Sequence, residues 1–444
     1  MSDHRLITQD VRAGLAGLPE ESVDLICTDP PYGYSFMGKD WDKAVPPVEV
    51  WRECLRVLKA GAFAFVMSSP RQDVLSRMIV NLQDAGFVTG FTSIYWCYAS
   101  GFPKASNIGK MVDKRAGVQK PKMIPTKKSN KLNQEGEISC GATGFTDISE
   151  PITPEALALD GSYGGFQPKP AVEVILVVMK PLSEKTYVDQ ALKNRKGITW
   201  LDGGRIPFVN SYDEKHQKDM QDGQLNAKRG IMFGGVGKSI SSGNLQGRFP
   251  ANLLVSDDAL NDGIGTKSGL VKEGYKRHIN SQFAQANESA LVGYPDSGSF
   301  SRYFDLDKWF DERIEELPES VRRVFPFLIV PKASKAEKNK GLEQGELQQV
   351  NDGRNIPPDN AFQRGATLRR NIHPTCKPVK LMSYLITIGS REGDLVCDPF
   401  CGSGTTLIAA ELLKRRSIGI DDDAEYIKIA EQRLAAMDNQ GKLV

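Results

Sequence analysis

Short apolar runs alternate with stretches of helical period through the N-terminal part of the chain. The runs at 6–8, 23–28 and 62–67 are nearly continuous in apolar residues, which is typical of strands buried on both faces. Between them, residues 50–58 and 74–82 place apolar side chains three and four positions apart, as an amphipathic helix does. This alternation predicts an α/β fold with a mostly parallel sheet and helices on both faces.

The same rhythm returns at the C-terminal end. The pattern predicts a helix over Val379–Ile388, a strand over Leu395–Cys397, a strand over Ser417–Ile420 and a last helix over Tyr426–Met437. Val172–Met179 is a further run of β-branched and apolar residues, and we expect it to join the same sheet as another strand.

The middle of the chain lacks this order. Lysines and an arginine gather between Lys104 and Lys131 in a segment with few large apolar residues, which indicates a basic connector. Residues 181–345 are rich in Gly, Ser, Asn and Lys and predict a second, irregular domain. One helix in it carries an apolar stripe through Leu306, Trp309 and Phe310. Packing against the rest of the protein is favoured for that stripe over a partner-binding face.

Composition narrows the class of protein to which this chain can belong. The 444 residues include 57 Lys and Arg against 55 Asp and Glu, so net charge alone indicates neither nucleic acid nor membrane. No apolar run reaches transmembrane length, and the polar start Met1–Arg5 leads into no signal-type stretch. The 7 cysteines form no C-x-x-C pair, which disfavours a zinc site and a disulfide framework. We expect a soluble, cytoplasmic protein without a metal.

One motif follows the second strand directly. Neither a strand nor a helix can continue through Asp29-Pro30-Pro31-Tyr32, because the prolines lack an N–H and fix φ. It presents a carboxylate and an aromatic ring at the carboxyl end of a strand, where ligands bind in open α/β sheets. Taken alone, these four residues could also form an ordinary proline turn.

A glycine turn follows a strand near the C-terminus. Its sequence is Asp398-Pro399-Phe400-Cys401-Gly402-Ser403-Gly404-Thr405-Thr406. Asp421 ends the next strand about twenty residues further on, where a carboxylate can accept hydrogen bonds from ribose hydroxyls. The turn lacks both the Gly-Lys-Ser/Thr of a P-loop and the full G-x-G-x-x-G spacing. It therefore predicts an adenosine-type ligand rather than a dinucleotide.

Together with His373-Pro374-Thr375-Cys376-Lys377-Pro378, these motifs resemble those of the S-adenosylmethionine-dependent amino-methyltransferases of DNA. The order, with the catalytic motif first and the cofactor motif last, is similar to the β group of that family. The resemblance covers roughly residues 1–117 and 365–435. It is looser in the middle, where 247–252 and 331–335 are similar to segments of phage and prophage members.

The resemblance implies a Rossmann-like, doubly wound methyltransferase sheet that is circularly permuted and carries an inserted irregular target-recognition domain. Residues 1–117 would form the catalytic half and residues 365–437 the cofactor-binding half. Between them we expect a basic connector at 118–171, a returning sheet strand at 172–180 and a DNA target-recognition domain at 181–345.

The same resemblance implies the site residues. The catalytic set is Asp29, Pro30, Pro31 and Tyr32, and the cofactor S-adenosylmethionine would be bound by Asp10, Thr375, Lys377, Asp398, Phe400, Gly402, Ser403, Gly404, Thr405 and Asp421. Three strand ends of the family sheet carry cofactor-facing acids, and Asp10 would be the third, at the adenine end. A solvated strand end is the alternative for Asp10. Thr375 and Lys377 would lie at a helix start near the methionine carboxylate, with a purely structural helix entry as the alternative.

The implied reaction is methylation of the N6 amine of adenine in double-stranded DNA, with the target base flipped out of the helix. Asp as the first motif residue leans toward adenine, and N4 of cytosine is the alternative because the same chemistry serves either amine. From another class, the chain could be a non-catalytic DNA-binding module that kept the fold. The lysines of 104–131 would contact phosphates, a solvated loop being the alternative. A homodimer and a cognate restriction endonuclease are partners that the sequence leaves open.

Overall fold

The structure of the chain is a computed structural model. The described residues are 3–33, 43–98, 106–118, 151–166, 171–207, 247–256, 260, 266–267, 297–299, 301, 304–315, 339, 341–342, 348–350, 367–369, 371 and 376–440. The chain divides into two compact units, one formed by residues 1–100 with 171–444 and the other by residues 101–170.

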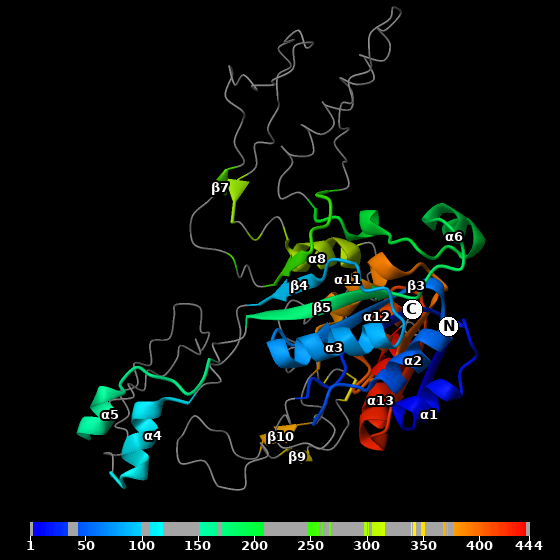
Figure 1. Cartoon of the computed structure of the whole chain (residues 1–444). Coiled ribbons are helices and arrows are strands. Elements are labelled where there is room, and N and C mark those ends of the chain that lie inside the picture. Colours follow the sequence, from blue (N-terminus) through cyan, green and yellow to red (C-terminus); the bar gives the residue numbers. More distant parts are fainter. Residues whose placement is uncertain are drawn as a thin grey trace, which may run out of the picture. The chain divides into compact units, whose positions relative to one another are not determined.

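An eight-stranded sheet forms the centre of the first unit (Figure 1). Its strands lie in the order β1 (His4–Thr8), β12 (Arg416–Asp421), β11 (Leu395–Asp398), β2 (Val23–Thr28), β3 (Leu58–Ser68), β5 (Val172–Met179), β4 (Ile94–Cys97) and β6 (Leu253–Val255). The first five are parallel, whereas β5 is antiparallel to β3 and β4. The predicted mostly parallel sheet is confirmed.

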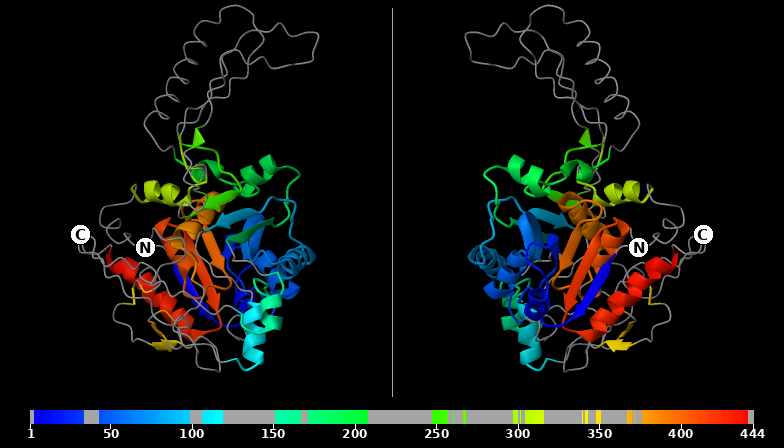
Figure 2. Two further views of the ribbon diagram at one scale, coloured as in Figure 1. Left: turned by 90° about the vertical axis from the view of Figure 1, so that its left-hand side faces the viewer. Right: turned by 90° about the vertical axis from the view of Figure 1, so that its right-hand side faces the viewer.

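This order also confirms the circular permutation. Two strands from the C-terminal end, β12 and β11, lie between β1 and β2 from the N-terminal end, and Figure 2 shows them side by side in orange-red and blue. β11 pairs with β2 so that Cys397 is opposite Ile26. The two strands are parallel, so their carboxyl ends, with Asp398 and Asp29, meet at one edge of the sheet.

Helices cover both faces of the sheet, because side chains of the central strands alternate between two apolar clusters. On one face lie α8 (Leu306–Glu315), α11 (Val379–Gly389), α12 (Thr405–Leu412) and α13 (Ala424–Gln440). On the other lie α1 (Val11–Ala16), α2 (Val48–Val57) and α3 (Gln72–Asp84). Leu25 points into the first cluster and its neighbour Ile26 into the second. The sheet is therefore doubly wound, as predicted.

The apolar stripe of α8 packs inside the first unit. Leu306 and Trp309 are buried, and the Trp309 ring lies 4.9 Å from the ring of Tyr384 on α11. The indole Nε1 donates a hydrogen bond of 2.9 Å to the carbonyl of Gly203. Packing against the protein itself thus accounts for this stripe, as expected.

Parts of residues 181–345 belong to the sheet and its flank rather than to a separate irregular domain. β6 extends the sheet by pairing with β4, and α6 (Tyr187–Asn194) is tied to β3 by the Gln190 side chain, which donates to the carbonyl of Ala60. A 3-10 turn, η3 (Leu201–Gly204), follows α6. Most of the predicted target-recognition segment, including 208–246 and 268–296, lies outside the described residues, and its role stays a prediction.

Short antiparallel pairs complete the described elements of the first unit. β7 (Thr266–Lys267) pairs with β8 (Ser297–Gly298), and β9 (Gln348–Val350) pairs with β10 (Thr367–Arg369). Among the helices in the described ranges, none is long and apolar enough to span a membrane.

The second unit is built on α4 (Ile108–Arg115) and α5 (Pro154–Ala158). The buried carboxylate of Asp113 on α4 accepts hydrogen bonds from the backbone N–H groups of Ile152 and Thr153, at 3.0 and 3.1 Å. It also accepts one from the Thr153 hydroxyl at 2.9 Å. α4 carries part of the predicted basic segment, and residues 119–150 of that segment lie outside the described ones.

Candidate active site

Asp29 follows the last residue of β2 and has a partner on each carboxylate oxygen. The Tyr32 hydroxyl donates a hydrogen bond of 2.6 Å to Oδ1, and the Lys377 ammonium lies 2.8 Å from Oδ2. Lys377 also donates to the Tyr32 hydroxyl at 3.3 Å and lies 5.3 Å from the centre of its ring. The Lys377 ammonium thus contacts both the first and the last residue of the Asp29–Tyr32 motif.

Lys377 has a second carboxylate partner that sequence reasoning missed. Its Nζ lies 3.1 Å from Oε2 of Glu173 on β5, and Tyr98, just after β4, is hydrogen-bonded to Glu173. In the structure Lys377 pairs with Asp29 of the Asp29–Tyr32 motif, and its predicted place at the methionine carboxylate stays a prediction. A signal for Glu173 was present, because it is an acid inside the otherwise apolar run Val172–Met179.

Burial and charge act in opposite directions on these groups. Burial raises the pKa of Asp29, the Lys377 ammonium lowers it, and Glu173 raises it further, with a net upward shift. Burial and the neighbouring Asp29 carboxylate raise the pKa of the Tyr32 phenol. Burial lowers the pKa of Lys377, but the two carboxylates outweigh it and raise the pKa above its ordinary value. Lys377 is therefore an ammonium at neutral pH.

The Asp398 carboxylate accepts hydrogen bonds from two residues of the glycine turn and from the neighbouring strand. Its Oδ1 accepts hydrogen bonds from the Thr28 hydroxyl at 2.6 Å and the Phe400 N–H at 3.1 Å, and its Oδ2 accepts one from the Thr406 hydroxyl at 2.5 Å. The residue is 3% exposed, and burial raises its pKa to about 6. These contacts assign Asp398 to holding the turn in shape.

The turn needs glycine where its backbone is left-handed. Gly402 has φ of 49° and Gly404 has φ of 78°, a region that residues with a Cβ rarely adopt. A Cβ at Gly404 would also lie 2.7 Å from Cβ of Ala430 on α13. Gly404 immediately precedes α12, so the unpaired N–H groups of the first helical turn belong to this segment.

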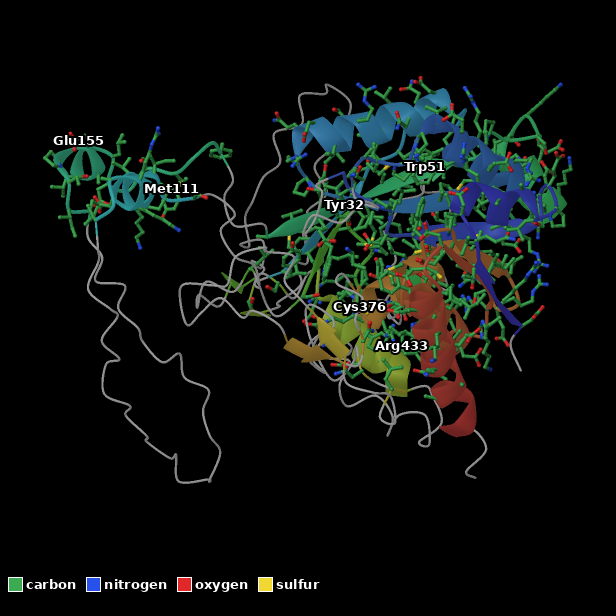
Figure 3. The ribbon with its side chains drawn as sticks, turned by 90° about the horizontal axis from the view of Figure 1, so that it is seen from below. Tyr32, Trp51, Met111, Glu155, Cys376 and Arg433 are labelled. Carbon is green, nitrogen blue, oxygen red and sulfur yellow. The ribbon has the colours of Figure 1, made fainter. Side chains whose placement is uncertain are left out.

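Arg433 of α13 supports the turn and was not predicted. Its NH1 donates to the carbonyl of Ser403 at 2.5 Å and lies 3.3 Å from the Thr405 hydroxyl. That hydroxyl is 3.2 Å from Sγ of Cys376. Cys376 and Arg433 are labelled in Figure 3. The guanidinium is buried at 3% exposure. It thereby joins the end of the His373–Pro378 motif to the turn. A charged residue on the apolar face of a helix, one turn after Ile429, was the available signal.

Asp421 and Asp10 end neighbouring strands. Asp421 Oδ2 accepts a 2.9 Å hydrogen bond from the Gly402 N–H, and burial raises the pKa of this carboxyl to about 6. Asp10 is exposed, and its Oδ1 accepts hydrogen bonds from the N–H groups of Arg12 and Ala13 at the start of α1. Both acids lie at the edge that carries Asp29, because Thr8 is in register with Asp421. A cofactor role for Asp10 stays a prediction, and Thr375 lies outside the described residues.

The groups around the turn fit an adenosyl ligand with a cationic centre. Asp421 offers a carboxylate to hydroxyl groups, and the glycines allow close approach of a ligand to the backbone. The negative carboxylates of Asp29 and Asp421 at this edge attract a ligand with a positive centre and repel one with a chain of phosphates.

Parts of this chain are similar in sequence to known DNA methylases. Residues 257–432 match the N6/N4 methyltransferase family model, which is described as DNA methylase. The Type II methyltransferase M2.DpnII of Streptococcus pneumoniae is 40% identical over 92 residues, 20% of this chain and 34% of the relative. M.HpaI of Haemophilus parainfluenzae is 41% identical over 97 residues, 21% of this chain and 31% of the relative. This chain is therefore similar to DNA methylases over residues 257–432.

The chain spans about a third of the length of each of those relatives. Among solved structures, a DNA modification methylase of Thermus thermophilus in complex with S-adenosyl-L-methionine is similar at 17% identity. Its TM-score is 0.34, over 98% of this chain and 94% of the other. The strand order of the first unit defines its fold.

Proposed function

We propose that this protein transfers a methyl group from S-adenosylmethionine to the N6 amine of adenine in double-stranded DNA. The observation that carries the proposal is the adjacency of two motifs. Asp29-Pro30-Pro31-Tyr32 ends β2, the glycine turn starting at Asp398 ends β11, and the two strands are hydrogen-bonded neighbours. When bound, S-adenosylmethionine supplies an electrophilic methyl group on a cationic sulfur.

The cofactor side would be formed by the turn and the neighbouring strand ends. Gly402, Ser403, Gly404 and Thr405 would line the ligand with backbone groups, and Asp421 would accept hydrogen bonds from the ribose. Phe400, directly after the strand, would contribute an apolar surface beside the adenosine. By resemblance to the family, Asp10 would lie at the adenine end and Thr375 at the amino-acid end.

The base side would activate a poor nucleophile. The lone pair of an exocyclic amine is delocalised into the ring, so the nitrogen needs acceptors that draw density onto it. The carboxylate of Asp29 and the carbonyl of Pro30 would accept hydrogen bonds from the amine, and the Tyr32 ring would stack on the base. Positioning and electrostatics then suffice, without a covalent enzyme intermediate.

DNA binding would draw on the basic residues of the second unit and of the central segment. α4 carries the part-exposed Lys110, and the exposed Lys114 and Arg115 lie in its last turn. Such cations neutralise phosphates and make affinity dependent on salt. Base-specific contacts would come from the segment between 181 and 345.

Adenine is favoured over cytosine by the acid at the first position of the motif. The test is incubation of the protein with methyl-tritiated S-adenosylmethionine and unmethylated DNA, followed by digestion and separation of nucleosides. Label in N6-methyldeoxyadenosine supports the proposal, and label in N4-methyldeoxycytidine would assign the alternative amine. Normal cofactor and DNA binding without label would favour a non-catalytic DNA-binding module. The Asp29→Ala variant serves as the blank.

A further inference from the structure

Glu173 is a part-buried acid at the site that belongs to none of the sequence motifs. It lies on β5, where residue 173 is paired with Trp96 of β4, and its side chain is 15% exposed. Its Oε2 lies 3.1 Å from the Lys377 ammonium, and Tyr98 is hydrogen-bonded to it. A carboxylate in this position loses part of its hydration, and the contacts with Lys377 and Tyr98 compensate for that loss.

The ammonium of Lys377 lies between two carboxylates. It is 2.8 Å from Oδ2 of Asp29 and 3.1 Å from Oε2 of Glu173. Two carboxylates and one ammonium give this cluster one net negative charge. Without Glu173, Lys377 would pair with Asp29 alone, and the cluster would be neutral.

We propose that Glu173 is a positioning residue for methyl transfer, which holds Lys377 so that the ammonium does not pair with Asp29 alone and the cluster keeps one net negative charge beside the target amine. The inference rests on the function proposed above and concerns the same site. Lys377 can remain on Glu173 when the amine approaches, so that Oδ2 of Asp29 becomes available to the incoming N–H. Tyr98 would keep the Glu173 carboxylate oriented toward Lys377.

The charge balance of the reaction explains why a negative cluster is useful. The amine lone pair forms the new N–C bond while the C–S bond breaks and leaves its electron pair on sulfur. The positive charge thus moves from sulfur to the amine nitrogen, until one N–H proton passes to Asp29 and then to water. A cluster with one net negative charge favours the cation along this path, whereas a neutral one does not.

The test is Glu173→Gln, which keeps the shape of the side chain and removes its charge. We expect kcat to fall on the order of 10²-fold, the loss typical of one preorganised electrostatic group. The dissociation constants for S-adenosylmethionine and DNA should stay within about 2-fold, because Glu173 would act on the reacting amine rather than on binding. Glu49→Gln on the exposed side of α2 is the matched control and should keep its rate.

A pH profile separates this role from a merely structural one. The charged or titratable groups acting on Asp29 are Tyr32, Lys377, Glu173 and the neighbouring Asp398, with Tyr98 beyond Glu173. Glu173 raises the pKa of Asp29, so its neutralisation should move the acid limb of the kcat profile to lower pH. A variant that only loosens the fold would lose rate without this shift.

A double variant and a ligand-free titration complete the experiment. If Glu173 acts by holding Lys377, Glu173→Gln should change kcat by less than about 3-fold in a Lys377→Met background. The Asp29 carboxyl, titrated by carbon NMR and assigned with Asp29→Asn, should show a lower pKa in Glu173→Gln without any substrate. An unchanged Asp29 pKa overturns the inference even if no methyl transfer is found. Absence of methyl transfer with the expected pKa change would instead contradict the proposed function.

Discussion

The Thr28 hydroxyl donates a 2.6 Å hydrogen bond to the Asp398 carboxylate, across 370 residues of sequence. Thr28 directly precedes Asp29, and Asp398 is the first residue of the glycine turn. A displacement of either strand end would therefore move the other. This bond fixes the spacing between the proposed base-side and cofactor-side halves of the site, which the proposed in-line transfer would require.

Asp29→Ala should abolish methyl transfer while nearly preserving cofactor binding. The carboxylate would act on the amine of the base, and its loss should lower kcat on the order of 10³-fold or more. Isothermal titration with S-adenosylmethionine gives the dissociation constant, and a labelled-methyl assay gives the rate. Cofactor affinity that falls in parallel with turnover would contradict the assignment of Asp29 to the base side.

Asp421→Ala should weaken cofactor binding by about an order of magnitude, the loss expected for a hydrogen-bonded carboxylate in a part-buried site. The substitution removes the proposed ribose acceptor and also the 2.9 Å bond from the Gly402 N–H. Asp422→Ala, at the exposed neighbouring position, is the control and should bind normally. An unchanged dissociation constant in Asp421→Ala would remove Asp421 from the cofactor site.

Asp398→Asn should change how stability depends on pH. Burial raises the folded-state pKa of Asp398 to about 6 from an ordinary value of 3.8, so the folded protein binds this proton more tightly than the unfolded chain. The stability that this proton contributes is fully present below the pKa of the unfolded state. It is lost as pH rises through about 6. Between pH 7.5 and 4.5, the unfolding free energy of the wild type should gain roughly 2 kcal/mol relative to the variant.

Urea unfolding of both proteins at several pH values measures that difference directly. The comparison is needed because other carboxyls act in the opposite sense. The Asp24 carboxyl is desolvated by burial, yet Lys196 and Lys59 together lower its pKa, so its contribution falls on acidification. A difference that is constant with pH would show that Asp398 is ionised in the folded protein throughout.

The layered fold was predictable because its signals are local. Buried parallel strands such as β2 are apolar on both faces and end at acids or prolines, so Asp29 and Asp398 mark strand ends without any tertiary information. The permutation followed from the order of those ends along the chain, compared with the sheet that the family resemblance implies. β6 was missed because three apolar residues in a Gly-rich and Ser-rich segment carry too little periodicity.

The partners of Lys377 and Arg433 could not be predicted from motifs. Glu173 reaches Lys377 from an antiparallel strand, and the contact depends on which face each side chain takes. Arg433 lies on a helix that supplies no motif residue, and its role appears only when α13 packs against the turn. Side-chain direction and distant packing, rather than propensity, decide these contacts.

Gly404→Ala should both destabilise the protein and weaken cofactor binding. The left-handed backbone alone costs about 1 kcal/mol with a Cβ, and the contact of 2.7 Å with Ala430 adds a clash. Gly393→Ala is the matched control, because φ is 82° there but the space around its Cβ is open. Gly404→Ala should therefore lose roughly 1–3 kcal/mol more than Gly393→Ala in chemical unfolding, and it alone should raise the cofactor dissociation constant.

Ala430→Gly in the Gly404→Ala background tests whether the clash is the cause. Removal of the opposing methyl group should restore part of the lost stability and of the cofactor affinity. The double variant should then be more stable than the sum of the two single changes predicts, although glycine inside α13 costs about 1 kcal/mol by itself. If the changes in unfolding free energy of the two single variants simply add, the whole effect of Gly404→Ala lies in its backbone conformation. Close packing of α13 against the turn would then have no part in holding the cofactor.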